Sequence, residues 1–245
     1  MSGELGVSEG PDVSGELNVG GEPTRLAGGR RPGILARGPW ETDAVQARWH
    51  ERDYAPDPSA AAAADAAIAD LRGRGSPTHD GASGRLVGFE QDGGRLAVEL
   101  EPARWALRLG PDAHDSMSAL CAVRDADGRW LAGRRAGWVA SWPGRWALGA
   151  GGAVDVGESP ALTLSRELME EWSVAPQRLT AEVLVRLPTG LVMLVGLAHL
   201  AAGAETDLVR DHEHDAHAWW PPDPADWPAE AEQPLRRMAT LLAST

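Results

Sequence analysis

Lysine is absent from this chain of 245 residues, so all 23 basic residues are arginine. Without lysine the protein cannot form a lysine Schiff base with a substrate or use the lysine of a phosphate-binding P-loop. Cysteine occurs only once, at Cys121, which excludes an intramolecular disulfide. The apolar neighbours of Cys121 predict a small buried side chain, and a reactive thiol is the less favoured interpretation.

Long apolar runs are missing as well. No stretch of about 18 apolar residues is present, which excludes a membrane-spanning helix by sequence, and the start, MSGELGVSEG, lacks the basic and apolar segments of a secretory signal. A net charge of −13 argues against nucleic-acid binding through a basic surface. We therefore expect a cytoplasmic protein that binds neither membranes nor nucleic acids. An anionic small molecule can still bind through a metal ion or a local group of arginines.

The first part of the chain is predicted to hold a tail and a small α+β unit. Residues 1–30 are rich in Gly, Ser and Glu without periodicity, which is typical of a mobile tail. Residues 31–111 form the α+β unit, because hydrophobic stretches alternate with turn residues. Its expected elements are a strand at 34–36, a helix from Thr42 or Asp43 to about 52, an alanine-rich helix at 58–72, and a hairpin at 85–101.

Residues 112–245 are predicted to form a second, larger domain. Strands joined mostly by hairpin turns, together with two helices, favour a mixed sheet with helices packed on it. The expected strands lie at 117–123, 129–134, 146–150, 183–187, 191–200 and 211–219, and the expected helices at 161–173 and 229–242.

Three glutamates indicate a metal site on the helix at 161–173. Glu167, Glu170 and Glu171 are spaced i, i+3 and i+4, so they crowd one helix face and repel one another. Leu164, Leu168 and Trp172 form a separate stripe for packing on the sheet. Carboxylate oxygens are the ligands that Mg²⁺ prefers. A solvated acidic helix face remains the alternative for the three glutamates taken alone.

The wider pattern favours the metal site, because residues 151–174 resemble the Nudix box. That box runs Gly, five residues, Glu, seven residues, Arg-Glu, an aliphatic residue, any residue, Glu-Glu, any residue, Gly, aliphatic. Ser173 replaces the last glycine, and it costs about 1 kcal/mol if the backbone there is left-handed. The matching residues are Gly152, Glu158, Arg166, Glu167, Leu168, Glu170, Glu171 and Val174.

The resemblance implies an α/β/α sandwich over residues 112–245 and a hydrolase that uses Mg²⁺ or Mn²⁺. It assigns the metal ligands to Glu167, Glu170, Glu171 and the Gly151 carbonyl. It implies that Gly152 and Glu158 support these ligands without binding the metal, and that Arg166 holds the carboxylates in place. Catalysis is expected from Arg166, Glu170, Glu171 and Glu213.

Glu213 is expected to supply a further metal ligand or the general base, a role for which Glu171 is the alternative. It lies in DHEHDAHAWW, which is similar to the family's Glu-His-x-x-x-x-Trp stretch. Alternation along a strand predicts Glu213, Asp215, His217 and Trp219 on one face. A zinc or iron site built from His212, His214 and His217 is a competing hypothesis.

Substrate binding is expected from residues just before the box. Arg134, Arg135 and Arg145 can contact phosphates, and Trp142 can stack on a base. The expected partner is a small nucleotide, ADP-ribose-like or a (d)NTP. The position of Pro188 slightly favours an ADP-ribose-like substrate. The alternatives are a nucleotide sensor without catalysis and an enzyme like isopentenyl-diphosphate isomerase. A homodimer is possible.

Overall fold

The computed structural model describes residues 24–25, 31–77 and 80–243. Its larger sheet has eight strands in the order β12-β7-β6-β11-β10-β2, with β8 paired with β7 and β9 with β6. The pair β6–β11 is parallel, and the other pairs of this sheet are antiparallel. These strands are β2 (Gly33–Glu41), β6 (Met117–Arg124), β7 (Trp130–Arg135), β8 (Trp146–Leu148), β9 (Ala150–Ala153), β10 (Arg178–Arg186), β11 (Val192–His199) and β12 (His214–Trp220).

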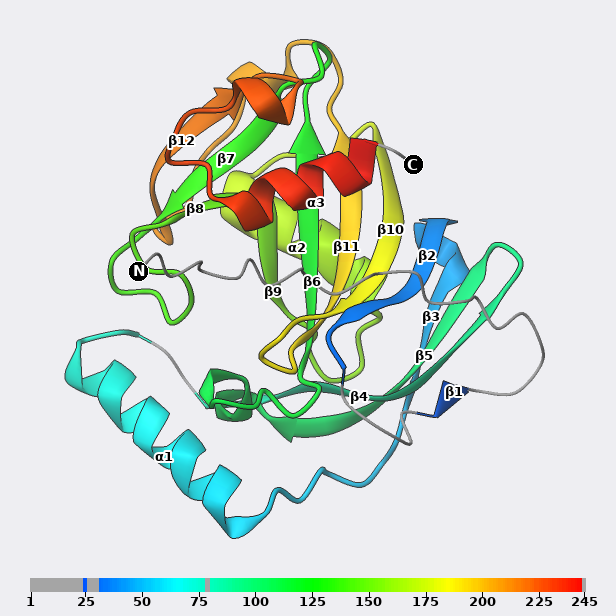
Figure 1. Ribbon diagram of the computed structural model, residues 1–245, viewed down its shortest axis with the longest axis vertical. Helices are drawn as coiled ribbons and strands as arrows, with labels where there is room; N and C mark the ends of the chain where they lie inside the picture. The colour runs from blue at the N-terminus through cyan, green and yellow to red at the C-terminus, as the bar shows by residue number, and fades with distance from the viewer. Residues whose placement is uncertain (1–23, 26–30, 78–79, 244–245) are drawn as a thin grey trace, which may run out of the picture.

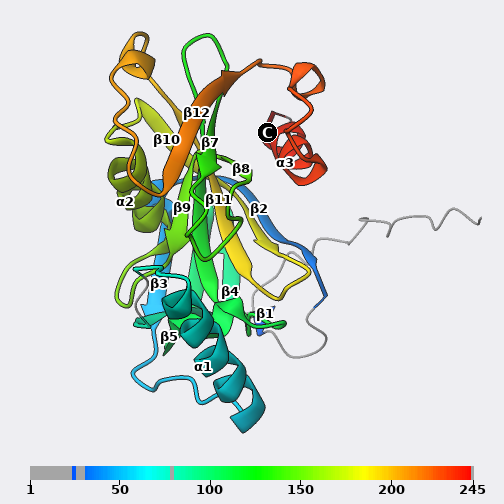
Figure 2. The same ribbon diagram turned by 90° about the vertical axis from the view of Figure 1, so that its left-hand side faces the viewer.

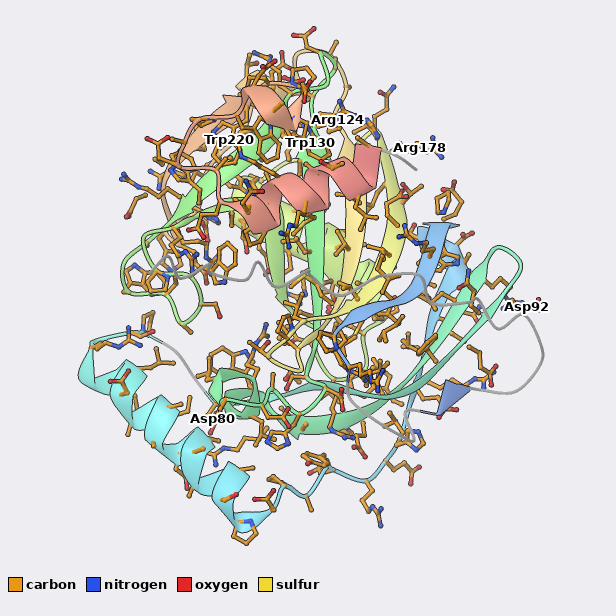
Figure 3. All side chains as sticks on the ribbon, in the orientation of Figure 1. Asp80, Asp92, Arg124, Trp130, Arg178 and Trp220 are labelled. Carbon is orange, nitrogen blue, oxygen red and sulfur yellow. The ribbon has the colours of Figure 1, made fainter. Side chains whose placement is uncertain are left out.

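Two helices cover opposite faces of this sheet, as the edge-on view in Figure 2 shows. One is α2 (Pro160–Trp172), whose Leu164 and Leu168 are fully buried. The other is α3 (Gln233–Ala243), which packs with Trp130 and Trp220 in a second apolar cluster. Both tryptophans lie beside α3 in Figure 3. The α/β/α sandwich expected from the sequence is therefore confirmed.

The N-terminal region forms a four-stranded sheet with a helix beside it (Figure 1). Its order is β1-β4-β5-β3, from β1 (Thr24–Arg25), β4 (Ala82–Asp92), β5 (Arg95–Arg104) and β3 (Val45–Trp49). The predicted alanine-rich helix is confirmed as α1 (Pro58–Gly73), where Asp57 accepts hydrogen bonds from the Ser59 and Ala60 amides. Apart from β1, the predicted tail at 1–30 lies outside the described residues.

The helix predicted from Thr42 or Asp43 to about residue 52 is wrong. The segment contains the 3₁₀ turn η1 (Thr42–Ala44) and then strand β3, which pairs in parallel with β5. Alternate residues of β3, from Val45 to Trp49, pack toward the core, a period of two that the short VQARW run already carries. Pairing with a distant strand decides between the two structures here. Three further short 3₁₀ helices are η2 (Trp105–Leu109), η3 (Ala204–Thr206) and η4 (Pro224–Asp226).

The N-terminal region is joined to the larger sheet by backbone pairing and by a shared core. Strand β2 pairs with β10 and thus forms one end of the eight-stranded sheet. Buried side chains of the small sheet, such as Leu86 and Leu100, belong to the same apolar cluster as Met117 and Leu164. The core on the α2 side therefore draws residues from both halves of the chain.

Candidate functional site

Helix α2 carries the acidic residues of the site, and its ends are fixed by local interactions. Ser159 caps the N-terminus by accepting a hydrogen bond from the Leu162 amide at 3.2 Å, and Pro160 occupies the first turn. The helix ends at Ser173, whose φ of 53° lies in the left-handed region. With Leu164, Leu168 and Trp172 in the core, the glutamates are held on the side of β9.

The three glutamates differ in exposure. Glu167 and Glu171 are buried, at 8% and 4% of their surface exposed, whereas the Glu170 side chain is 58% exposed. A Cβ at position 152 would come within 2.2 Å of the Glu167 carboxylate, so glycine is required for this close packing. The Gly151 amide lies 3.3 Å from Glu171 Oε1 and donates a hydrogen bond to it. The glycines of the box thus face the buried carboxylates.

Arg166 holds the acidic group together from within the same helix. Its guanidinium lies 3.0 Å from Glu158, 2.8 Å from Glu167 and 3.0 Å from Glu170, and it donates to the Ala153 carbonyl at 3.1 Å. Burial by itself would lower the pKa of Arg166, but the ion pairs with these carboxylates raise it. Arg166 thus holds three carboxylates of the box close together through ion pairs.

A second arginine links Glu213 to the glutamates of α2. Arg135 Nη2 lies 3.1 Å from Glu213 Oε2, and Arg135 Nη1 lies 3.8 Å from Glu171 Oε1. Glu213 is thereby brought to the same site, although it is 42 positions beyond Glu171 in the sequence. The sequence pointed to Arg135 as a phosphate ligand. In the structure Arg135 contacts two carboxylates, those of Glu171 and Glu213. Its charge alone did not indicate this pairing.

The strict alternation predicted around Glu213 is wrong. Glu213 precedes β12, and the strand has a bulge between His214 and Ala216, because these two residues pair with Arg135 and Arg134. The bulge allows both His214 and His217 to contact Trp172, with ring centroids 4.8 and 5.9 Å away.

His214 is a component of the site that the sequence did not single out for this role. It is 1% exposed, its Nδ1 lies 3.0 Å from Asp211 Oδ1, and its Nε2 lies 3.7 Å from Glu171 Oε2. Burial lowers the pKa of His214, and the hydrogen bond with Asp211 opposes this effect. His214 thus lies between Asp211 and the buried Glu171.

The carboxylates fit a divalent cation in their chemistry. Among the described residues Glu171 Oε2 is buried without a hydrogen-bond partner, since 3.7 Å to His214 is too long. Burial raises the pKa of Glu171 well above its usual value and that of Glu167 to about 7, with Glu170 adding to the effect on Glu167. Buried carboxylates that resist ionisation are stabilised as anions when a cation binds them.

The side chains are not arranged as a closed metal cage. No three carboxylate, imidazole or thiol groups converge on one point in the ranges that the structure describes. Glu167 and Glu170 contact Arg166 instead, and Glu213 contacts Arg135. A cation held by these residues would therefore compete with two arginines for the carboxylate oxygens.

The histidines do not support the competing zinc or iron site. His212 stacks on Trp138, with ring centroids 5.2 Å apart, while His214 and His217 contact Trp172. Nδ1 of His214 is occupied by Asp211. All three imidazoles pack against tryptophan rings, and no three groups that could hold a metal converge among the described residues.

Of the predicted substrate-binding residues, only Arg135 contacts glutamates of the site, namely Glu171 and Glu213. Arg134 is exposed, and strand alternation places it on the face of β7 opposite to Arg135. Arg145 forms an ion pair with Glu232 and lies over the Trp142 ring, 4.6 Å from its centroid. Trp142 is 36% exposed. These two residues remain candidates for binding a more distant part of a substrate.

Cys121 is fully buried in β6, as the sequence predicted. Burial, with a contribution from Glu171, raises the pKa of its thiol to about 12. Such a thiol is neither accessible nor readily ionised, which argues against chemistry like that of isopentenyl-diphosphate isomerase.

In the part of the chain that the structure describes, no helix has the length and hydropathy to cross a membrane.

Comparison with known proteins gives a clear family match. The NUDIX domain model matches residues 115–242, which is more than half of the chain. Among solved structures, a MutT NUDIX hydrolase from Burkholderia pseudomallei is 28% identical, covering 53% of this chain and 98% of that chain, with a TM-score of 0.43. A C. elegans Ap4A hydrolase is 22% identical, covering 53% and 99%, with a TM-score of 0.38. Curated proteins gave no match. With the box residues assembled on α2 and β9, the chain belongs to the Nudix family and is a Nudix hydrolase.

Proposed function

We propose that this Nudix hydrolase is a Mg²⁺-dependent pyrophosphohydrolase, with Mn²⁺ as a possible substitute, that cleaves the phosphoanhydride of a nucleoside diphosphate linked to another group. The observation that carries the proposal is the buried pair Glu167 and Glu171, at 8% and 4% exposure. One oxygen of this pair has no hydrogen-bond partner among the described residues. A protein does not retain such an oxygen for stability, because an unsatisfied buried acceptor costs about 1–3 kcal/mol.

The cation would be held by Glu167, Glu170 and Glu171, with the Gly151 carbonyl beside them. When bound, it neutralises phosphate charge and makes a water molecule more acidic. Arg166, which contacts Glu158, Glu167 and Glu170, keeps the carboxylates from repelling one another.

Glu213 is the stronger candidate for the general base. Its side chain is 37% exposed and lies 3.1 Å from Arg135, so it is both accessible and positioned. Glu171, at 4% exposure and with a raised pKa, is better suited as a metal ligand. We assign proton acceptance from the attacking water to Glu213, with Glu171 as the alternative; attack on phosphorus then displaces a phosphate ester.

The position of Pro188 slightly favours ADP-ribose-like compounds over (d)NTPs as the proposed substrates. Pro188 also begins a tight turn in which the Gly190 amide donates to the Leu187 carbonyl at 2.9 Å. The turn explains the proline by itself, so the substrate choice is left to experiment.

A panel of nucleoside diphosphate derivatives and (d)NTPs tests the proposal by measuring phosphate-ester release with Mg²⁺. Glu170→Gln and Glu171→Gln are each expected to lower kcat by about 100-fold or more, because each removes a metal ligand. Glu230→Gln, at an exposed position distant in sequence from the box, is the matched control and should retain full activity. Absence of turnover with every compound would falsify the proposal. Nucleotide binding without turnover would favour a sensor.

A further inference from the structure

One arginine near the site comes from outside the region that matches the family. Arg108 belongs to η2 (Trp105–Leu109), whereas the NUDIX domain model begins at residue 115. Figure 1 shows this short helix between α1 and the lower end of β6. The N-terminal region therefore places a guanidinium at the start of a central strand of the Nudix sheet.

Arg108 is anchored next to the box. Its Nη2 lies 2.5 Å from the Ser118 hydroxyl, and Ser118 is buried in β6 at 2% exposure. Ser118 pairs with Ala153 of β9, the residue after Gly152. Gly152 in turn packs against the carboxylate of Glu167. The hydrogen bond to Ser118 thus places the Arg108 side chain beside the strand pair β6–β9, which also includes Gly152.

Within the described part of the chain, the charge of Arg108 has no opposite partner at close range. No carboxylate of a described residue lies within 4.0 Å of its guanidinium, which instead contacts Ser118 and the Trp105 ring. The other arginines of the neighbourhood are engaged. Arg135 pairs with Glu171 and Glu213, and Arg166 pairs with four carboxylates.

We propose that Arg108 binds a phosphate group of the substrate, so that the N-terminal region completes the active site of the Nudix domain. The inference rests on the proposed function, because it takes a diphosphate as the ligand. A half-buried guanidinium with free donors is suited to phosphate oxygens, which it contacts through two parallel hydrogen bonds. The cation at Glu167 and the guanidinium of Arg108 then neutralise the diphosphate from different elements.

The electrostatic environment agrees with this placement. The pKa of Arg108 is lowered to about 10, mainly by burial, while Glu167 opposes this effect and Arg135 adds to it. Arg108 therefore remains a cation at neutral pH while interacting with both groups. An anion bound between Arg108 and Arg135 would reduce the repulsion between the two guanidinium groups. It would also offset the cost of burying the Arg108 charge.

The test measures binding of methylenediphosphonate, which carries two phosphonates and no base, by calorimetry with and without Mg²⁺. Arg108→Gln is expected to weaken binding about tenfold or more, with a matching rise in KM for the substrate found in the panel and a smaller change in kcat. Arg108→Lys keeps the positive charge but loses the two parallel donors of the guanidinium, so an intermediate affinity is expected. Arg95→Gln, on the β5 hairpin where it contacts Gln46, is the control and should change neither quantity.

Unfolding midpoints of each variant separate a binding role from a structural one. A stable Arg108→Gln with unchanged affinity and KM overturns the inference while leaving the hydrolase intact. Absence of turnover with affinity that still depends on Arg108 overturns the proposed function and keeps the inference. Failure of the unmodified protein to bind methylenediphosphonate at all also overturns the inference, as does an Arg108→Lys variant that loses stability but not affinity.

Discussion

At the scale of single residues, the site is built from carboxylates placed where they are unfavourable without a cation. Glu167 and Glu171 are buried beside each other, and Arg135 and Arg166 compensate only part of the cost. Raised pKa values for both groups express that remaining cost. Function, and not stability, therefore accounts for their position.

The stability of the metal-free protein is expected to fall as pH rises. In the folded protein the pKa of Glu167 is about 7, against about 4.5 for the unfolded chain, so the folded state binds more protons between these values. The free energy of unfolding then decreases from about pH 4.5 to pH 7, and Glu171 acts in the same direction.

Thermal unfolding in EDTA and in Mg²⁺ measures this effect. Mg²⁺ should raise Tm more at pH 8 than at pH 5, because the cation binds only the ionised carboxylates. In EDTA at pH 8, Glu167→Gln should raise Tm by several degrees, whereas Glu230→Gln should leave it unchanged. An equal Mg²⁺ effect at both pH values would contradict the assignment.

At the scale of elements, both ends of α2 are specified locally, but its C-terminus is strained. Ser173 has φ 53° and ψ 33°, and its amide donates to the Met169 carbonyl at 3.0 Å. Glycine reaches this left-handed conformation without the steric cost that a Cβ imposes. The departure from the Nudix box at this position therefore affects stability, and it lies outside the three α2 carboxylates proposed to bind the cation.

Ser173→Gly is expected to stabilise the protein by about 1 kcal/mol. Ser165→Gly, on the exposed face in the middle of α2, is the matched control and should destabilise it by about 0.5 kcal/mol. The midpoints of urea unfolding, compared with that of the unmodified protein, show whether each substitution stabilises or destabilises it. If both substitutions destabilise the protein, the left-handed conformation at position 173 is not the source of strain.

At the scale of the whole molecule, the two halves of the chain share one structure. Strand β2 pairs with β10, and Asp115 forms a buried ion pair with Arg186 at 2.8 Å and lies 3.7 Å from Arg85 of β4. Asp115 and Arg186 are 3% and 4% exposed at their side chains. Buried pairs of this kind make separation of the parts costly, because each would leave a charge unpaired.

A fragment of residues 112–245 is therefore expected not to fold cooperatively. It lacks β2 beside β10 and the apolar side chains of β4 and β5 that pack on the core. The full chain should show one transition, coincident by tryptophan fluorescence and far-UV circular dichroism. Adding residues 1–111 to the fragment should restore structure. Cooperative unfolding of 112–245 alone, near the midpoint of the full chain, would show that the two regions are independent.

The amino-acid sequence determined the local features of this protein. The box spacing predicted α2, its carboxylates and the family, because i, i+3 and i+4 positions share a face in any helix. The turn residues likewise predicted the hairpin of β4 and β5. Only the tertiary structure decided that VQARW is a strand, that β2 joins the distant β10, and that Arg108, Arg135 and His214 lie near Glu167 and Glu171. These depend on pairing and burial between residues far apart in the chain, and even the period of two in VQARW does not by itself decide between a strand and a helix.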